Sequence, residues 1–294
     1  MTRELVPTSP LATRAVFQQT LAEPVAVSGV GLHSGTTVTC HLHPATIHSG
    51  KYFVRTDLPE QPTVNASLEV ATPAQLSTLL QQGEATVRTI EHLMAALAGC
   101  RIDNCRIEID GPEVPILDGS ARPWVEAIQA AGLAEQDGSL PLVTLDTPVT
   151  VWEGEAFVSA VPSPVTRYSY GIDFPDSPIG EQWFSWTESP GVFAEAIAPA
   201  RTFTTEANAR LAQQAGLIKG GSLDNAIVCT ETEWLTPLRF ENEPVRHKLI
   251  DLLGDLSLTG RRWQAHFIAY KASHTLHGRF ARELLDVANR SQDS

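Results

Sequence analysis

Long apolar runs are missing from this sequence. None approaches the roughly 20 residues that a membrane-spanning helix needs. The segment from Met1 to Leu11 contains two prolines and lacks the apolar core of a signal peptide. We therefore expect a cytoplasmic protein that makes no stable insertion into membranes.

Cysteine is also scarce. The four cysteines form no CxxC pair and are too sparse for a disulfide scaffold, so we expect reduced thiols, as in a cytoplasm. An HExxH motif is absent as well. These absences exclude the common zinc-finger and zinc-protease patterns.

Basic residues are also few relative to acidic ones. The chain has 21 Lys and Arg against 34 Asp and Glu, which gives a net charge of -13. Because nucleic-acid phosphates are bound by surplus Lys and Arg, we expect no nucleic-acid partner. An anionic substrate would need a local basic pocket.

The chain is long enough for two domains. Its 294 residues are 43% hydrophobic, which suffices for two cores of ordinary size. Residues 1–20, punctuated by Pro7 and Pro10, are expected to form a loose arm. The polar segment Gln136 to Val143 looks turn-rich and marks the expected boundary. It separates an N-terminal domain (21–138) from a C-terminal domain (139–294).

Hydrophobic periodicity predicts strands and helices in both domains. Strands are predicted at Thr37 to His43, Cys105 to Asp110, Val149 to Val151, Phe157 to Val161, Arg167 to Ile172 and Trp263 to Tyr270. Helices are predicted at Thr89 to Ala98, Arg122 to Ala131, Thr205 to Ala215, Val245 to Leu258 and Leu276 to Ala288. Runs of strands followed by helices favour the α+β class.

One predicted helix carries a row of chemically active side chains. In RHKLIDLLGDL, His247, Asp251 and Asp255 follow one another at steps of four. At 100° per residue they share an arc of roughly 80°, with the leucines near the opposite side. The row is either a solvated polar face or part of a site.

A second predicted helix places two such residues at its start. In TIEHLMAALAG, Glu91 and His92 precede apolar and small residues, so this helix is expected to be largely buried. A buried carboxylate must be paired, hydrogen-bonded or functional, since an unpaired one costs several kcal/mol. A satisfied His-Glu pair in the core is the alternative.

A third stretch, AYKASHTLHG, follows the last predicted strand. Lys271 and His274 are expected on the turn after it, where functional residues are common. A plain surface histidine is the alternative for His274.

The histidines without motif support are expected to be ordinary strand or loop residues: His41, His43, His48, His266 and His277. His33, between glycines, is expected to have a structural use in a turn.

Together these residues could hydrolyse an amide. Two imidazoles and a carboxylate, from His92, His247 and Asp251, leave one open position on a tetrahedral zinc ion. Glu91 could then accept a proton from water, and His274 could stabilise the oxyanion and protonate the leaving amine. Asp255 could keep His274 charged. Zinc is expected, although iron or cobalt could occupy the same ligands.

Seven motifs, in order over nearly the whole chain, resemble the UDP-3-O-acyl-N-acetylglucosamine deacetylases of lipid A biosynthesis. They are GVGLHSG (29–35), TIEHLMAALAG (89–99), IDNCRIEIDGPEVPILDGSARPWV (102–125), ARTF (200–203), GGSLDNAIV (220–228), RHKLIDLLGDL (246–256) and AYKASHTL (269–276). The resemblance implies a zinc-dependent enzyme that removes the N-acetyl group of a UDP-linked acylated amino sugar.

The resemblance also implies a fold and residue roles. The fold would be a two-domain α+β sandwich in which each domain is an antiparallel sheet with two helices and the helices pack face to face. By this resemblance the zinc ligands would be His92, His247 and Asp251. Glu91 would be the general base, and His274, supported by Asp255, would be the charged residue. Thr202 would assist the reacting carbonyl. Substrate contacts would come from Phe203, Ile218, Gly221, Lys248 and Lys271.

An apolar passage for the acyl chain is a further implication. It would lie in an insert near Phe203 to Val228, whose apolar residues could equally be ordinary helix packing. Thr204 and Thr205 after ARTF, and Lys219 before GGS, depart from the family pattern, so the acyl length stays open. We expect a monomer.

Two other functions fit parts of the sequence. One is a zinc amidohydrolase for another acetylated sugar. The other is a binding module for nucleotide sugars or nucleic acid, which would have no need of the general base Glu91.

Overall fold

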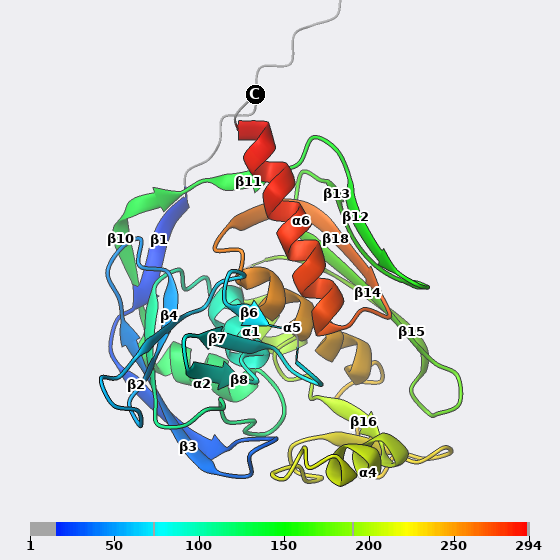
Figure 1. Cartoon of the computed structure of the whole chain (residues 1–294). Coiled ribbons are helices and arrows are strands. Elements are labelled where there is room, and N and C mark those ends of the chain that lie inside the picture. Colours follow the sequence, from blue (N-terminus) through cyan, green and yellow to red (C-terminus); the bar gives the residue numbers. More distant parts are fainter. Residues whose placement is uncertain (1–15, 73, 190, 293–294) are drawn as a thin grey trace, which may run out of the picture.

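The computed structural model describes residues 16–72, 74–189 and 191–292. Its α+β class, predicted from the sequence, is confirmed (Figure 1). Strands and helices fall into two halves, each with a five-membered run of paired strands and a pair of helices. No helix in this described part is both long and apolar enough to cross a membrane.

The N-terminal half is built on one mixed sheet. Its strands, in spatial order, are β2 (Val25–Val30), β3 (Thr37–Pro44), β9 (Cys105–Ile109), β4 (Lys51–Arg55) and β5 (Thr63–Asn65). Helices α1 (Glu91–Gly99) and α2 (Arg122–Ala131) pack together, and α2 contacts β2. A small sheet joins β6 (Ala71–Thr72), β7 (Leu79–Gln82) and β8 (Ala85–Arg88).

The C-terminal half repeats this plan. Its sheet has the order β12 (Val149–Glu153), β13 (Ala156–Pro162), β18 (Arg262–Tyr270), β14 (Arg167–Phe174) and β15 (Gly180–Thr187), with β11 (Leu142–Thr144) paired to β18. Helix α5 (Glu243–Ser257) packs on β14 and β15, and α6 (His274–Gln292) packs on β12 and β13. The short helix α3 (Val192–Ala196) precedes α5.

The sheets are mixed, whereas the family resemblance implied antiparallel ones. Strand β4 is parallel to β9, and β14 is parallel to β18. Parallel neighbours need a crossover connection, and α1 and α5 lie in those two connections. The remaining neighbours in both five-membered runs are antiparallel.

Two sequence predictions about loops were wrong. Residues 16–20 of the expected arm belong to β1 (Val16–Leu21), which pairs antiparallel with β10 (Leu133–Leu140); residues 1–15 lie outside the described part. The expected turn-rich boundary at 136–143 is largely strand, in β10 and β11. Strand β10 carries no local strand signal, because many of its residues are polar and one is Gly138. Pairing with β1 stabilises the strand despite this low β propensity.

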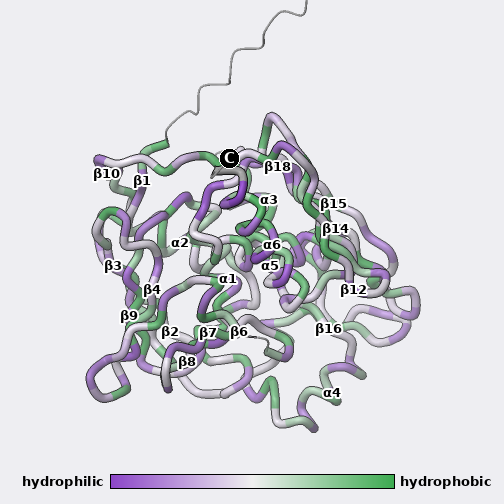
Figure 2. Tube along the Cα trace, turned by 45° about the horizontal axis from the view of Figure 1, so that its top comes forward, coloured by the Kyte–Doolittle hydropathy of each residue, from purple (hydrophilic) through white to green (hydrophobic). Residues whose placement is uncertain are grey.

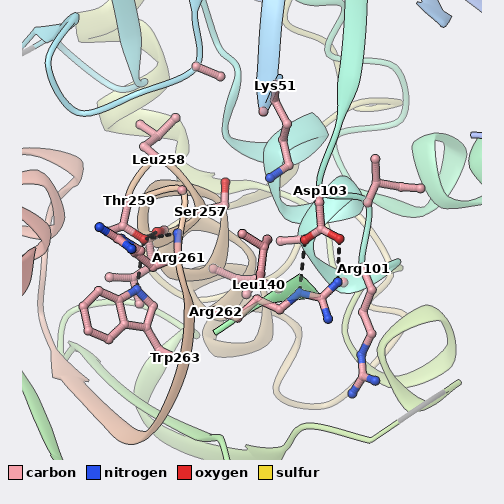
Figure 3. A pocket seen from close by; sticks show the side chains of 18 of the residues that line it. Lys51, Arg101, Asp103, Leu140, Ser257, Leu258, Thr259, Arg261, Arg262 and Trp263 are labelled. Carbon is pink, nitrogen blue, oxygen red and sulfur yellow. Dashed lines mark hydrogen bonds and ion pairs between the residues drawn. The ribbon is translucent and has the colours of Figure 1, made fainter. Parts of the chain in front are cut away.

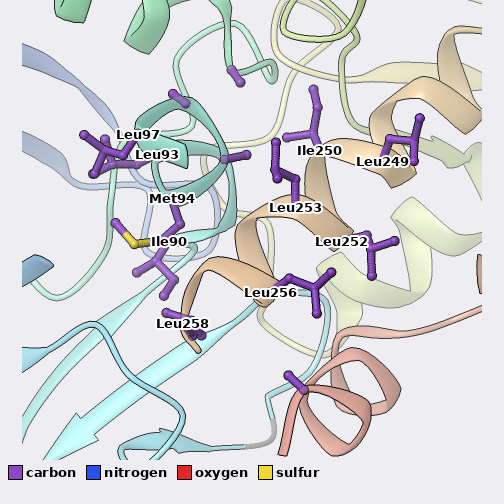
Figure 4. Close-up of a cluster of buried hydrophobic side chains, with 14 of the residues drawn as sticks. Ile90, Leu93, Met94, Leu97, Leu249, Ile250, Leu252, Leu253, Leu256 and Leu258 are labelled. Carbon is purple, nitrogen blue, oxygen red and sulfur yellow. The ribbon is translucent and has the colours of Figure 1, made fainter. Parts of the chain in front are cut away.

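Helices α1 and α5 form the central contact between the halves (Figure 4). Seven of the nine α1 residues are buried, and so are twelve of the fifteen in α5. Leu93, Met94 and Leu97 lie on α1, and Leu249 and Leu253 lie on α5, in one continuous core. This confirms the predicted packing of helices from the two halves against each other.

The last residues of α1 and of α5 border a cavity of about 680 Å³ between the halves (Figure 3). An ion pair crosses it, because Arg262 of β18 donates to both carboxylate oxygens of Asp103, at 3.0 and 2.6 Å. The cavity therefore contains a polar link between the halves, and it lies away from the motif residues at the start of α1.

The insert predicted near 203–228 forms a separate unit. Strand β16 (Phe203–Thr205) is followed by α4 (Glu206–Gln214) and by β17 (Ile227–Cys229), which is parallel to β16. Thr205 caps α4 by accepting from the Asn208 N–H. Figure 2 shows α4 at the edge of the molecule with mixed hydropathy, and Leu211 is 63% exposed.

Gly254 permits the close approach of α5 to α1. A Cβ added there would clash with the Glu91 carbonyl oxygen. Alanine normally gains up to about 1 kcal/mol over glycine in a helix. At Gly254, however, overpacking should dominate, and we expect Gly254→Ala to lower the free energy of unfolding by about 1 to 3 kcal/mol in urea denaturation.

Gly278 in α6 provides the matched control, because a Cβ there would meet only ordinary contact at 3.6 Å. We expect Gly278→Ala to leave the unfolding free energy unchanged or to raise it by up to about 1 kcal/mol. Equal effects of both substitutions would contradict the packing argument.

Candidate metal centre

Three buried side chains from the two facing helices converge. The Nε2 atoms of His247 and His92 lie 3.4 and 4.0 Å from Oδ1 of Asp251. The two imidazole rings meet edge to face, with centroids 4.8 Å apart. His247 and Asp251 come from successive turns of α5 and His92 comes from the first turn of α1.

The surroundings orient these groups as ligands. Nδ1 of His247 donates to the Ala200 carbonyl at 3.0 Å, which leaves Nε2 with a free lone pair. Oδ2 of Asp251 accepts from Lys248 Nζ at 2.7 Å. Oδ1 of Asp251 is buried without a hydrogen-bond partner among the described residues. An orphaned carboxylate oxygen facing two imidazole nitrogens fits a bound cation.

Protonation states favour metal binding. Burial, followed by the neighbouring His247, lowers the pKa of His92 to about 3, and burial also lowers the pKa of His247. Burial alone would raise the pKa of Asp251, but Lys248 and the histidines hold it well below its usual value. At neutral pH all three groups are in the form that binds metals.

Glu91, the first residue of α1, lies beside this cluster. Its side chain is buried, and Oε2 accepts from the Thr78 backbone N–H at 3.1 Å. Burial raises the pKa of Glu91 to about 7, in part opposed by the positive charge of His274. A carboxylate with a pKa near neutrality is suited to accept and release protons.

His274 and Asp255 form a second pair at the same site. Nδ1 of His274 lies 2.7 Å from Oδ2 of Asp255, and Nε2 lies 3.9 Å from Oδ2 of Asp251. Burial alone would lower the pKa of His274, but Asp255 and Asp251 raise it to about 9. His274 is therefore charged at neutral pH. It begins α6, whereas the sequence predicted a turn there.

The last two residues of ARTF reach the edge of the cluster. The Phe203 ring lies edge to face with His247, with centroids 6.5 Å apart. Thr202 is fixed through its backbone, because its N–H donates to the Gly119 carbonyl at 2.8 Å. Gly119 has a φ of 83° and a Cβ there would strike the Asn225 carbonyl, so glycine is required.

Ile218 and Gly221 belong to a loop that lies on the N-terminal half. The Ile218 N–H points to Nδ1 of His33 at 3.5 Å, and the Gly220 N–H donates to the Leu32 carbonyl at 2.9 Å. Gly221 closes the turn by donating to the Ile218 carbonyl at 3.0 Å. His33 is buried in this contact, in agreement with the structural use expected for it.

The two lysines that the resemblance places at the substrate, Lys248 and Lys271, differ in their surroundings. Lys248 is engaged by Asp251, as above, and its ammonium also lies over the Tyr170 ring, 5.8 Å from the centroid. Lys271 has a left-handed φ of 52° and lies 3.4 Å from Asp173 and 3.5 Å from Glu155. Lys271 is thus more accessible than Lys248, with side chains 33% and 17% exposed.

Sequence reasoning missed two members of the site. Thr78 donates from its hydroxyl to Oδ1 of Asp255 at 2.6 Å, and no motif marked it. His277 is completely buried and lies 2.8 Å from Oδ2 of Asp255. Its spacing of three from His274, which places both on one helix face, was the available signal.

Comparisons with known proteins agree with this geometry. A family model described as UDP-3-O-acyl N-acetylglycosamine deacetylase matches residues 18–286. The chain belongs to this family. The deacetylase family is one of metalloenzymes, and His92, His247 and Asp251 are candidate metal-binding residues of this member.

Relatives named UDP-3-O-acyl-N-acetylglucosamine deacetylase are similar over almost their full length. The protein of Trichormus variabilis is 53% identical over 278 residues, which cover 92% of this chain and 99% of that protein. The protein of Thermosynechococcus vestitus is 52% identical, with coverage of 92% and 94%. A probable mitochondrial deacetylase 1 of Arabidopsis thaliana is 44% identical, with coverage of 95% and 91%.

Two aspartates one turn apart on α5 offer a matched test of metal binding. Asp251→Asn replaces the orphaned anionic oxygen with a neutral one, and we expect the affinity for Zn²⁺ to fall by more than about 100-fold in competition with a chromophoric chelator. Asp255→Asn removes a carboxylate already saturated by hydrogen bonds, and the loss should stay below about 10-fold. Equal losses would refute the assignment of Asp251.

Proposed function

We propose that this chain hydrolyses the N-acetyl group of UDP-3-O-(3-hydroxyacyl)-N-acetylglucosamine and releases acetate and the free amine, a step of lipid A biosynthesis. The observation that carries the proposal is the convergence of two neutral imidazoles and one unpartnered carboxylate oxygen, next to Glu91 and His274, in a chain of this family. Binding alone would need neither a group that accepts protons near neutral pH nor a buried histidine that is charged at neutral pH.

Zinc is the proposed ion, held by His92, His247 and Asp251. Two neutral ligands and one anionic ligand leave a divalent ion with net positive charge. When bound, such an ion supplies a Lewis acid that polarises the acetyl carbonyl and makes water more acidic. Lys248 holds the second oxygen of Asp251, so that Oδ1 stays directed at the ion.

Glu91 and His274 divide the proton transfers. Glu91 accepts the proton of the attacking water, because its pKa of about 7 keeps a carboxylate available at neutral pH. His274 carries the positive charge that the developing oxyanion needs, and it donates a proton to the departing nitrogen. The water oxygen forms the new bond to the acetyl carbon, and the C–N bond breaks.

Substrate contacts are proposed for the residues around the cluster. Phe203 packs on the sugar nucleotide beside His247, and the Thr202 hydroxyl assists the reacting carbonyl. Lys271 and Lys248 meet the anionic part of the substrate, Lys248 from its place beside Asp251. The β16–α4–β17 unit, which includes Ile218 and Gly221 between α4 and β17, borders an apolar passage for the acyl chain.

The setting of the reaction is part of the proposal. The chain works as a monomer in the cytoplasm, with domains over 21–138 and 139–294 that share the site. Deacetylation rates of UDP-N-acetylglucosamine with and without a 3-O-acyl chain test the substrate: we expect the acylated compound to react far faster. Equal rates would instead indicate that the enzyme acts on another acetylated sugar.

Glu91→Gln and His247→Ala separate the two kinds of role. Glu91→Gln keeps the shape of the side chain and the ligand set, so we expect normal zinc content and a kcat lower by about 100-fold or more. His247→Ala should lose both metal and activity. Zinc analysis of the purified variants checks this, and equal zinc loss in both would contradict the assigned roles.

The two proton-transfer groups predict a bell-shaped pH profile. Activity should rise as Glu91 loses its proton, at or below pH of about 7 because a bound cation lowers its pKa further. Activity should fall as His274 loses its proton, at or below pH of about 9 because a cation bound at Asp251 offsets part of the charge that raises the pKa of His274. Since Asp255 raises the pKa of His274, Asp255→Asn should move the alkaline limb of kcat/KM to lower pH.

Asp286→Asn, an exposed aspartate on α6, is the control for that shift and should leave the profile unchanged. An alkaline limb that stays in place in Asp255→Asn would remove His274 from its assigned role.

A further inference from the structure

Asp255 is shared by two histidines of the same helix. His277 follows His274 by three residues on α6, and the Nδ1 atoms of both lie at Oδ2 of Asp255, at 2.8 and 2.7 Å. The other oxygen, Oδ1, accepts from the Thr78 hydroxyl at 2.6 Å. Three donors from two different segments therefore fix both oxygens of one carboxylate on α5.

The hydrogen bonds also define the state of His277. Because a carboxylate only accepts, Nδ1 of His277 must carry a proton. Its other ring nitrogen, Nε2, lies 3.1 Å from the Tyr170 hydroxyl, which donates its proton to the Ala272 carbonyl at 2.8 Å. Tyr170 thus fixes the His277 ring from behind.

We propose that His277 is a positioning residue for the reaction: through its Nδ1–H it fixes the Asp255 carboxylate and thereby directs the His274 imidazole toward the metal centre. His277 is not one of the residues proposed to hold the ion. The inference rests on the proposed function, since it assigns His277 a part in that chemistry. The inference goes beyond the proposed function by adding His277, a residue that belongs neither to the sequence motifs nor to the proposed metal ligands.

The alternative is that His277 only fills space. Its side chain is completely buried, and its ring packs edge to face against Tyr170 and His274, with both centroid distances 5.9 Å. A filler would be replaced well by an apolar side chain of similar volume. A positioning donor would be replaced well only by a group that keeps an N–H near the position of Nδ1.

Two substitutions separate these roles. His277→Asn can place an amide N–H where Nδ1 was, although it leaves a void and loses the contact with Tyr170. His277→Leu fills more of the volume and favours the helix, but it has no donor. We expect His277→Asn to keep kcat within about threefold of the wild type and His277→Leu to lose about 10- to 100-fold, with KM and zinc content unchanged in both.

Thermal unfolding is measured on the same samples. Activity that follows the melting temperature, or a His277→Leu variant as active as His277→Asn, would overturn the proposal. His266→Leu is the matched control, because His266 is bonded to Ser169 on β14 and has no link to Asp255. Its kcat should equal that of the wild type.

A second readout does not depend on the substrate. Imidazole N–H protons bonded to a buried carboxylate appear at low field in proton NMR when exchange is slow. We expect such a signal for His274 Nδ1–H in the zinc-loaded wild type and in His277→Asn, and its loss or broadening in His277→Leu. An unchanged His274 signal in His277→Leu would overturn the positioning role, whereas absent deacetylation with the expected NMR pattern would overturn only the proposed function.

Discussion

The approach of α1 to α5 at Gly254 is the constraint on which the site depends. Glu91 and His92 begin one helix, and His247, Asp251 and Asp255 lie along the other. Only the missing side chain at Gly254 lets the Glu91 backbone come close enough for both sets to face one volume. The apolar faces of both helices stabilise this contact, so the same packing that joins the halves also assembles the polar cluster.

That cluster carries an energetic cost in the free protein. Oδ1 of Asp251 is buried without a hydrogen bond, and leaving such a group unsatisfied costs about 1 to 3 kcal/mol, more when it is charged. A cation shared with His92 and His247 removes this cost, and its binding therefore stabilises the folded state. Around it, Lys248, the Ala200 carbonyl and the Thr78 backbone hold the ligands and Glu91 in place before any ion arrives.

Much of this was predictable from sequence, and the failures have physical causes. The spacing of four placed His247, Asp251 and Asp255 on one face of a helix whose position was predicted closely, because local periodicity determines both. Strand β10 was missed because its pairing with β1 is a tertiary effect on a polar, glycine-containing segment. His277 was dismissed because only the fold shows that it and His274 share Asp255.

The central claim is that His92, His247 and Asp251 bind one ion together. Crystals of the zinc-loaded protein, measured on both sides of the zinc absorption edge, test it most directly. We predict a single strong anomalous peak within about 2.0 to 2.2 Å of both Nε2 atoms and of Asp251 Oδ1. A peak at Asp255, His274 and His277 instead, or zinc bound away from α1, would contradict the account.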